Sequence, residues 1–209
     1  MSLDNSLFIL SKHNCLDSMI IEMTKQKINE AKGLAEVTHK RFCGLRGHYN
    51  NTPKSHFLGH LGEIAYETYF HSNNYKTDSL FRESSSTKNC DIVLTSDSEK
   101  IRIEVKTWSE HYWEDLGRCI AVDQIEKLKN KCDIIVWCIV KQPVPDYFSE
   151  TISCFIDVGL WSTLNDISES PVRLTGRCRM RKVNNFQVDI GRIRSEDELK
   201  NEINKYLLG

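Results

Sequence analysis

Two acidic residues and a lysine near the middle of the chain have the types and spacing that metal-dependent chemistry requires. Asp91 directly precedes an apolar run at residues 92–94, and Glu104 and Lys106 occur two residues apart in a second run. In that second run, residues 101–106, apolar side chains alternate with charged ones. A period of two is typical of a half-buried β-strand with its charged side chains on one face. Glu104 and Lys106 are therefore expected to project from the same face.

The two runs are expected to form a β-hairpin, because residues 96–99 (Ser-Asp-Ser-Glu) are turn formers and solvated polar residues. A turn centred in this segment places Ile92 opposite Ile103 and Asp91 opposite Glu104. Directly opposite side chains point to the same face, with Cβ atoms about 5 Å apart. The registry of the hairpin would thus bring the two carboxylates together.

Two facing carboxylates repel each other and destabilise a hairpin unless a cation lies between them. Oxygen ligands from two strands suit a hard divalent ion such as Mg²⁺. Lys106 would lie about 7 Å beyond Glu104 on the same face, where its amino group can hold a water molecule aimed at a phosphate or, when neutral, deprotonate it. The alternative interpretation is a surface hairpin that carries ordinary solvated charges.

Composition sets broad limits on the class of protein. The 209 residues are 40% hydrophobic and 27% charged, and the formal net charge is −1, so any polyanion site must be a local patch. The eight cysteines form no Cys-x-x-Cys pair, which favours reduced, mostly buried thiols in a cytoplasmic protein over a disulfide framework or zinc cluster. No apolar run has the length of a membrane span, and we expect no membrane partner.

Periodicity predicts one compact α/β domain over residues 1–209, with a core at about 55–140 and a basic extension at about 171–209. The predicted elements, in chain order, are a long helix over 16–37, a helix over 56–73, a short strand within 75–83, the hairpin, a helix over 121–130, a doubly covered strand over 132–140, a strand over 151–158, a helical excursion over 159–167, and a C-terminal strand and helix introduced by the capping box Ser195–Glu198.

The predicted helix over 56–73 carries Gly59 and Gly62 on the side opposite its apolar face. A glycine inside a helix costs about 1 kcal/mol relative to alanine, so we expect another element to pack closely there, and Glu63 projects from that side. His56 and His60 share a face at i,i+4 spacing, which is compatible with zinc. No His-Glu-x-x-His order accompanies them, and a DNA-facing or structural role is favoured.

Basic, aromatic and polar residues outside the hairpin are candidates for contacts with a nucleic acid. Alternatively, they belong to solvated loops and strand faces, and the tryptophan and tyrosine cap the core. The candidates are Arg41, Arg46, His60, Trp108, Tyr112, Arg118, Gln124, Arg177, Arg179 and Arg181.

The order of helix, three strands, helix and strand, together with these motifs, resembles the PD-(D/E)XK nuclease superfamily. Residues 59–66 look like its first helix, with Glu63 towards the metal, Asp91 matches the motif aspartate, and residues 104–106 match E-x-K. Gln124 is a weaker match to a polar helix residue near the site. Cys90 replaces the name-giving proline, on which no chemistry depends. The resemblance covers about residues 55–140 and implies a restriction-endonuclease-like αβββαβ core, a mixed sheet flanked by helices.

The resemblance implies a Mg²⁺-dependent DNA endonuclease, such as one of the restriction or homing kind, with Mn²⁺ able to substitute. Asp91, Glu104, the Val105 carbonyl and Glu63 would bind the metal, and Lys106 would position the attacking water. Three alternatives remain: a repair or recombination nuclease such as a junction resolvase or exonuclease, an inactive DNA-binding module on the same fold, and a zinc protein. Double-strand cutting would favour a two-fold homodimer.

Overall fold

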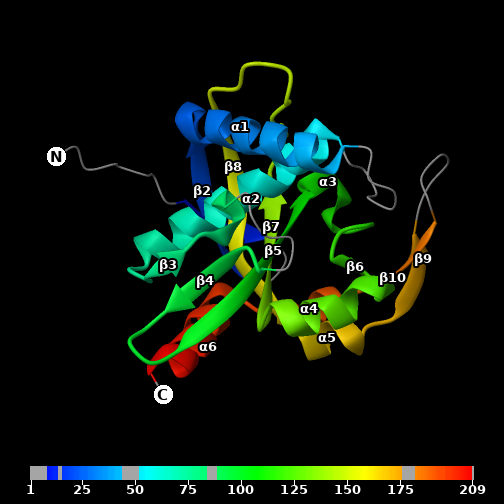
Figure 1. Cartoon of the computed structure of the whole chain (residues 1–209). Coiled ribbons are helices and arrows are strands. Elements are labelled where there is room, and N and C mark those ends of the chain that lie inside the picture. The colour runs from blue at the N-terminus through cyan, green and yellow to red at the C-terminus, as the bar shows by residue number, and fades with distance from the viewer. Residues whose placement is uncertain (1–8, 14–15, 44–51, 84–88, 176–181, 209) are drawn as a thin grey trace.

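The chain is built on a seven-stranded mixed sheet (Figure 1). A computed structural model describes residues 9–13, 16–43, 52–83, 89–175 and 182–208. The strand order is β1-β2-β8-β7-β5-β4-β3. The β5–β7 pair is parallel and the other neighbouring pairs are antiparallel. The strands are β1 (Ile9–His13), β2 (Leu16–Thr24), β3 (Thr77–Asp78), β4 (Ile92–Thr95), β5 (Lys100–Ser109), β7 (Ile134–Val140) and β8 (Ser153–Thr163). The predicted α/β class and helix-flanked mixed sheet are confirmed.

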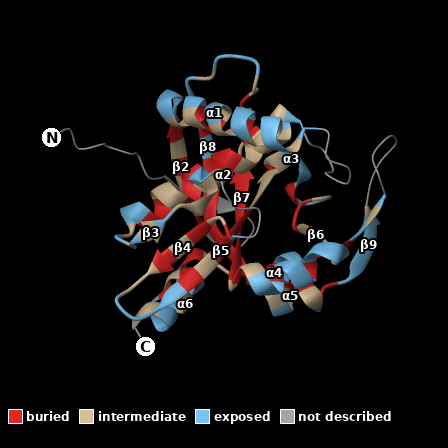
Figure 2. Ribbon diagram, viewed as in Figure 1, coloured by how far each residue is buried: buried red, intermediate tan, exposed pale blue. Residues whose placement is uncertain are grey.

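Helices cover both faces of this sheet, and a second sheet of three strands, in the order β6-β10-β9, lies beside it. The helices are α1 (Lys25–Phe42), α2 (Pro53–Ser72), α3 (Glu110–Trp113), α4 (Ile125–Lys131), α5 (Leu164–Ser168) and α6 (Glu196–Leu208). Turns of 3-10 helix are η1 (Leu80–Arg82), η2 (Val122–Gln124) and η3 (Ile190–Arg192). The small sheet contains β6 (Cys119–Ala121), β9 (Val172–Thr175) and β10 (Val183–Gln187). Figure 2 shows that buried residues concentrate in α2 and the central strands, whereas α1 exposes its outer face.

Strand β7 lies between two hydrophobic clusters, as its continuous apolar sequence predicts. Val136 and Cys138 pack with α1, α2 and α6 on one face, and Ile135 and Trp137 pack with α4 and α5 on the other. Each residue of the strand is buried. This position fixes the parallel neighbour β5, and with it Glu104 and Lys106, in the middle of the molecule.

The hairpin of β4 and β5 has the predicted registry. Leu94 pairs with Ile101 and Ile92 pairs with Ile103. The paired ladder ends there, and the N–H of Asp91 donates to the Ile103 carbonyl at 3.0 Å. Asp91 is therefore the first residue beyond the ladder and is still held against β5.

The predicted helix over residues 16–37 is wrong in its first half, because residues 16–24 form β2 and the helix begins at Lys25. Ile21 and Met23 point into the core and Glu22 lies between them, less buried. The cluster of apolar residues there fits both periods, and pairing with β8 selects the strand. Thr24 then caps α1 by accepting from the N–H of Lys27.

The predicted helical excursion over 159–167 is also wrong for most of its length. Strand β8 continues to Thr163, and the helix α5 begins only at Leu164. Gly159 has a φ of 95°, a conformation that favours glycine, and its N–H donates to the buried Tyr66 hydroxyl at 2.9 Å. Pairing of residues 160–163 with β7 keeps this segment extended.

The C-terminal capping box and several buried thiols agree with the sequence-based expectations. Ser195 and Glu198 form the predicted capping box, with the N–H of Ser195 donating to the Glu198 carboxylate at 2.9 Å. Free, buried thiols are confirmed at Cys90, Cys132 and Cys138. Within the parts of the chain that the structure describes, no helix is long and apolar enough to cross a membrane.

The two glycines of α2 have different surroundings, and this difference predicts opposite effects of substitution. A Cβ at Gly62 would lie 2.0 Å from Thr107 Oγ1 and 2.9 Å from Cys138 Sγ, whereas a Cβ at Gly59 meets nothing within 4 Å. The close approach predicted for this side is thus present at Gly62 and absent at Gly59. We expect Gly62→Ala to lower the free energy of unfolding by about 1–3 kcal/mol.

Gly59→Ala is the matched control, because it places the same methyl group on the same helix where there is room. The better helix propensity of alanine should stabilise this variant by up to about 1 kcal/mol. Urea denaturation of both variants measures the difference. Equal stability of Gly62→Ala and Gly59→Ala would contradict the packing of α2 on β5.

Candidate functional site

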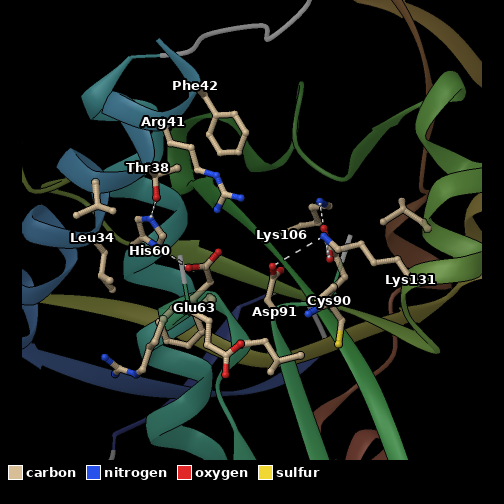
Figure 3. A pocket seen from close by; sticks show the side chains of 18 of the residues that line it. Leu34, Thr38, Arg41, Phe42, His60, Glu63, Cys90, Asp91, Lys106 and Lys131 are labelled. Carbon is tan, nitrogen blue, oxygen red and sulfur yellow. Dashed lines mark hydrogen bonds and ion pairs between the residues drawn. The ribbon is translucent and has the colours of Figure 1, made fainter. Parts of the chain in front are cut away.

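The hairpin, α1, α2 and α4 enclose a cleft of about 900 Å³ (Figure 3). The floor is formed by Asp91, Glu104 and Lys106, and α2 adds His60 and Glu63. One wall is the second half of α1, and the opposite wall is η2 with α4. The cleft thus contains the four side chains proposed from sequence as catalytic: Asp91, Glu104, Lys106 and Glu63.

The two acids of the hairpin are recessed in the cleft. The side chain of Glu104 is 6% exposed and that of Asp91 is 17% exposed. Asp91 Oδ2 accepts from the N–H of Val105 at 2.8 Å. A strand residue directs its N–H and C=O to the same edge, so the Val105 carbonyl also points towards the Asp91 side. Two carboxylates and one carbonyl thus approach the same space.

Two lysines neutralise Glu104. Lys106 Nζ lies 2.7 Å from Glu104 Oε1, and Lys131 Nζ, from the last residue of α4, lies 2.6 Å from Glu104 Oε2. Lys131 Nζ is also 4.0 Å from Asp91 Oδ1. The carboxylate of Glu104 is therefore held between ammonium groups from two different elements.

The charges of these four groups shift their protonation equilibria. Burial, followed by the negative charges of Glu104 and Glu63, raises the pKa of Asp91 well above its usual value. Burial alone would raise the pKa of Glu104, but Lys106 and Lys131 bring it below its usual value. Burial opposes the charge of both lysines, and the two acids outweigh it and raise the pKa of each. Glu104 and the lysines are consequently charged at neutral pH.

His60 connects α1 to the acidic floor. Its Nδ1 lies 2.5 Å from Glu63 Oε2 and its Nε2 lies 2.8 Å from Thr38 Oγ1. His60 is 7% exposed, so its ring is held between the two helices and orients Glu63. This arrangement places His60 beside the acids and reduces the surface that it can offer to a nucleic acid.

The other residues predicted to contact nucleic acid are scattered. Arg41 and Gln124 line the cleft on opposite walls. Trp108 is half-buried against the second hydrophobic cluster, and Tyr112 is exposed on α3 outside the cleft. Arg118 is buried, and its guanidinium donates to the carbonyls of Val188, Trp113 and Glu114. The predicted DNA contact of Arg118 does not fit this position, because the guanidinium donors bind carbonyls of the fold itself.

Arg46, Arg177, Arg179 and Arg181 lie outside the described residues. Among the residues that are described, no group of three or more His, Cys, Asp or Glu side chains is gathered closely enough to hold a metal ion. Asp91 and Glu104 thus meet as a pair of acids, with Lys131 and Lys106 beside them.

The sequence gives no signal for Lys131 or, apart from Arg41, for the wall that α1 forms. Lys131 is the last residue of a short helix that precedes a predicted buried strand. The direction of its side chain depends on the order of the strands in the sheet, which the sequence pattern does not give. The parallel pairing of β5 and β7 brings the end of α4 over the hairpin. The family resemblance, which covers about residues 55–140, does not include helix α1, although Leu34, Thr38 and Phe42 line the cleft.

Comparison of this chain with family models, with curated proteins and with solved structures finds no match. The function must therefore be inferred from the site itself.

Proposed function

We propose that this protein is a Mg²⁺-dependent DNA endonuclease with a restriction-endonuclease-like core. The observation that carries the proposal is the convergence of Asp91, Glu104 and Lys106 in one recessed cleft, by means of a hairpin whose registry the sequence predicts. The order α2, β3, β4, β5, α4 and β7 agrees with the αβββαβ order of the PD-(D/E)XK superfamily, with the short elements α3 and β6 inserted between β5 and α4. These two agreements are independent, because one concerns topology and the other side-chain chemistry.

The donor atoms suit a hard divalent ion. Asp91 and Glu104 supply carboxylate oxygens, and the Val105 carbonyl faces the same side; such oxygens are the ligands that Mg²⁺ prefers. Burial, followed by the negative charges of Glu104 and Glu63, raises the pKa of Asp91, and a bound cation would favour its ionised form. Asp91, Glu104 and Val105 would hold Mg²⁺, with Glu63 next to them, and Mn²⁺ would substitute. The ion would supply stabilisation of the negative charge that develops on the phosphate.

Lys106 would position the attacking water. Phosphodiester hydrolysis forms a bond from a water oxygen to phosphorus and breaks one ester bond, with one proton of the water passing by way of the surrounding solvent to the leaving oxygen. The acids raise the pKa of Lys106 above its usual value, so its ammonium donates hydrogen bonds and does not accept the proton. Its task is orientation of water and phosphate.

Lys131 occupies the place beside Glu104 that a divalent cation would need. We expect Lys131→Met to bind Mn²⁺ roughly tenfold more tightly than the unaltered protein, because Glu104 Oε2 loses its competing ammonium. Isothermal titration calorimetry measures the affinity. Lys129→Met, on the same helix but paired with the exposed Glu126, is the control. Weaker binding by Lys131→Met would show that Lys131 supports the metal site instead of competing for it.

The test of the proposed function is incubation of the purified protein with Mg²⁺ and plasmid, linear and branched DNA, followed by mapping of the products. Internal cuts in plasmid DNA that EDTA abolishes are expected. Cleavage confined to junctions or ends would assign a repair or recombination nuclease. DNA binding without any cleavage would support a non-catalytic module and contradict the proposal.

A further inference from the structure

The cleft is bordered by aromatic side chains that metal binding and hydrolysis do not require. Phe42, at the end of α1, and Phe81, in η1, both line it and are half-buried. Each ring has an arginine over it: Arg41 lies 5.5 Å from the centroid of Phe42, and Arg82 lies 4.9 Å from that of Phe81. Figure 3 shows Arg41 and Phe42 projecting from α1 into the cleft.

Positive charge lies on both sides of the acidic floor. Arg41 belongs to the α1 wall and Lys127 to the α4 wall. A phosphate that reaches Asp91 would therefore have a cationic side chain on either side of it. Proteins bind single-stranded nucleic acids with cations placed close to aromatic rings, since phosphates pair with the cations and bases stack on the rings.

The depth of the acids opposes a paired duplex. Glu104 and Asp91 are 6% and 17% exposed, so the scissile phosphate must descend between α1 and α4. The cleft of about 900 Å³ falls in the range of roughly 300–1,000 Å³ in which proteins enclose a drug-sized ligand, which is the size of a few linked nucleotides. In a duplex the bases are stacked on each other and could not use Phe42 or Phe81.

From these observations we propose that the cleft binds an unpaired segment of DNA, with a phosphate at the acids and a base stacked on Phe42. This inference rests on the proposed nuclease function, because the acids define where the phosphate lies. It adds a substrate class: a single strand, a frayed end or a flap, in preference to continuous duplex.

The test measures binding separately from cleavage. Fluorescence anisotropy in EDTA compares a labelled oligonucleotide alone with the same oligonucleotide annealed to its complement. We expect the single strand to bind about tenfold more tightly than the duplex. Phe42→Ala should weaken single-strand binding about tenfold, and Phe42→Trp should retain it. Phe148→Ala removes an 81% exposed phenylalanine outside the cleft and should change nothing.

The salt dependence gives a second readout. Arg41→Ala should reduce the slope of log affinity against log salt by about 0.7 for single-stranded DNA, the value for one lost phosphate contact. Equal affinity for single strand and duplex, or the same loss for Phe148→Ala as for Phe42→Ala, would overturn the inference.

Cleavage in Mg²⁺ separates the two proposals. Preferential cutting of single-stranded or flapped DNA supports both. Efficient cutting of continuous duplex without preference leaves the nuclease standing and overturns the single-strand inference. If the protein binds single-stranded DNA through Phe42 but cleaves no DNA, the inference that the cleft binds unpaired DNA is supported and the proposed catalysis is overturned.

Discussion

Lys106→Ala is expected to lower the rate of Mg²⁺-dependent DNA cleavage by about 10²–10³-fold, while folding and DNA binding are retained. The loss follows from removal of the ammonium that would orient the attacking water. Folding should survive because Glu104 keeps its ion pair with Lys131 at 2.6 Å. A plasmid-nicking assay gives the rate, and circular dichroism and anisotropy report the fold and the DNA affinity.

Lys129→Ala is the control for this experiment, since Lys129 is on α4 outside the cleft and pairs with exposed Glu126. Its cleavage rate should equal that of the unaltered protein. Full activity of Lys106→Ala would remove Lys106 from the mechanism. A parallel loss of DNA affinity in that variant would instead place Lys106 in substrate binding.

Asp91→Asn is expected to abolish cleavage and yet to stabilise the metal-free fold. The asparagine oxygen can still accept from the N–H of Val105, and the substitution removes a buried charge that Glu104 and Glu63 repel. A gain of about 1 kcal/mol would raise Tm by about 2–4 °C for a protein of this size. Thermal unfolding in EDTA measures the gain.

The stability difference should depend on pH in a defined direction. Because the pKa of Asp91 is raised in the folded state, the unfolded chain releases this proton first as the pH rises. The unaltered protein therefore loses stability between the usual carboxyl range, near pH 4, and the raised value, and Asp91→Asn does not. The free energies of unfolding of the two proteins should converge at acidic pH and differ at neutral pH.

Added Mg²⁺ should return the lost stability to the unaltered protein at neutral pH and leave Asp91→Asn unchanged, since binding to the folded state stabilises it. Asp97→Asn, in the solvated turn of the same hairpin, controls for loss of one negative charge. Identical responses of Asp91→Asn and the unaltered protein to Mg²⁺ would contradict metal binding by Asp91.

Local pattern was sufficient for the hairpin and for β7. The alternation in residues 101–106 fits only a strand. The turn before this strand sets the hairpin registry that places Asp91 beside Glu104. The apolar run of β7 likewise required cover on both faces. Pattern failed at residues 16–24 and 159–163 because short apolar segments fit either period. Pairing with β8 made the first segment a strand, and pairing with β7 made the second one a strand.

The sequence by itself determined the acids, the lysine next to them and the oxygen chemistry that they offer, because these residues are neighbours on one hairpin. Only the tertiary structure decided that Lys131 reaches Glu104, that α1 forms a wall with Arg41 and Phe42, and that Arg118 is buried. Those contacts join segments distant in the chain, and their geometry depends on the order of strands in the sheet, which local periodicity does not encode.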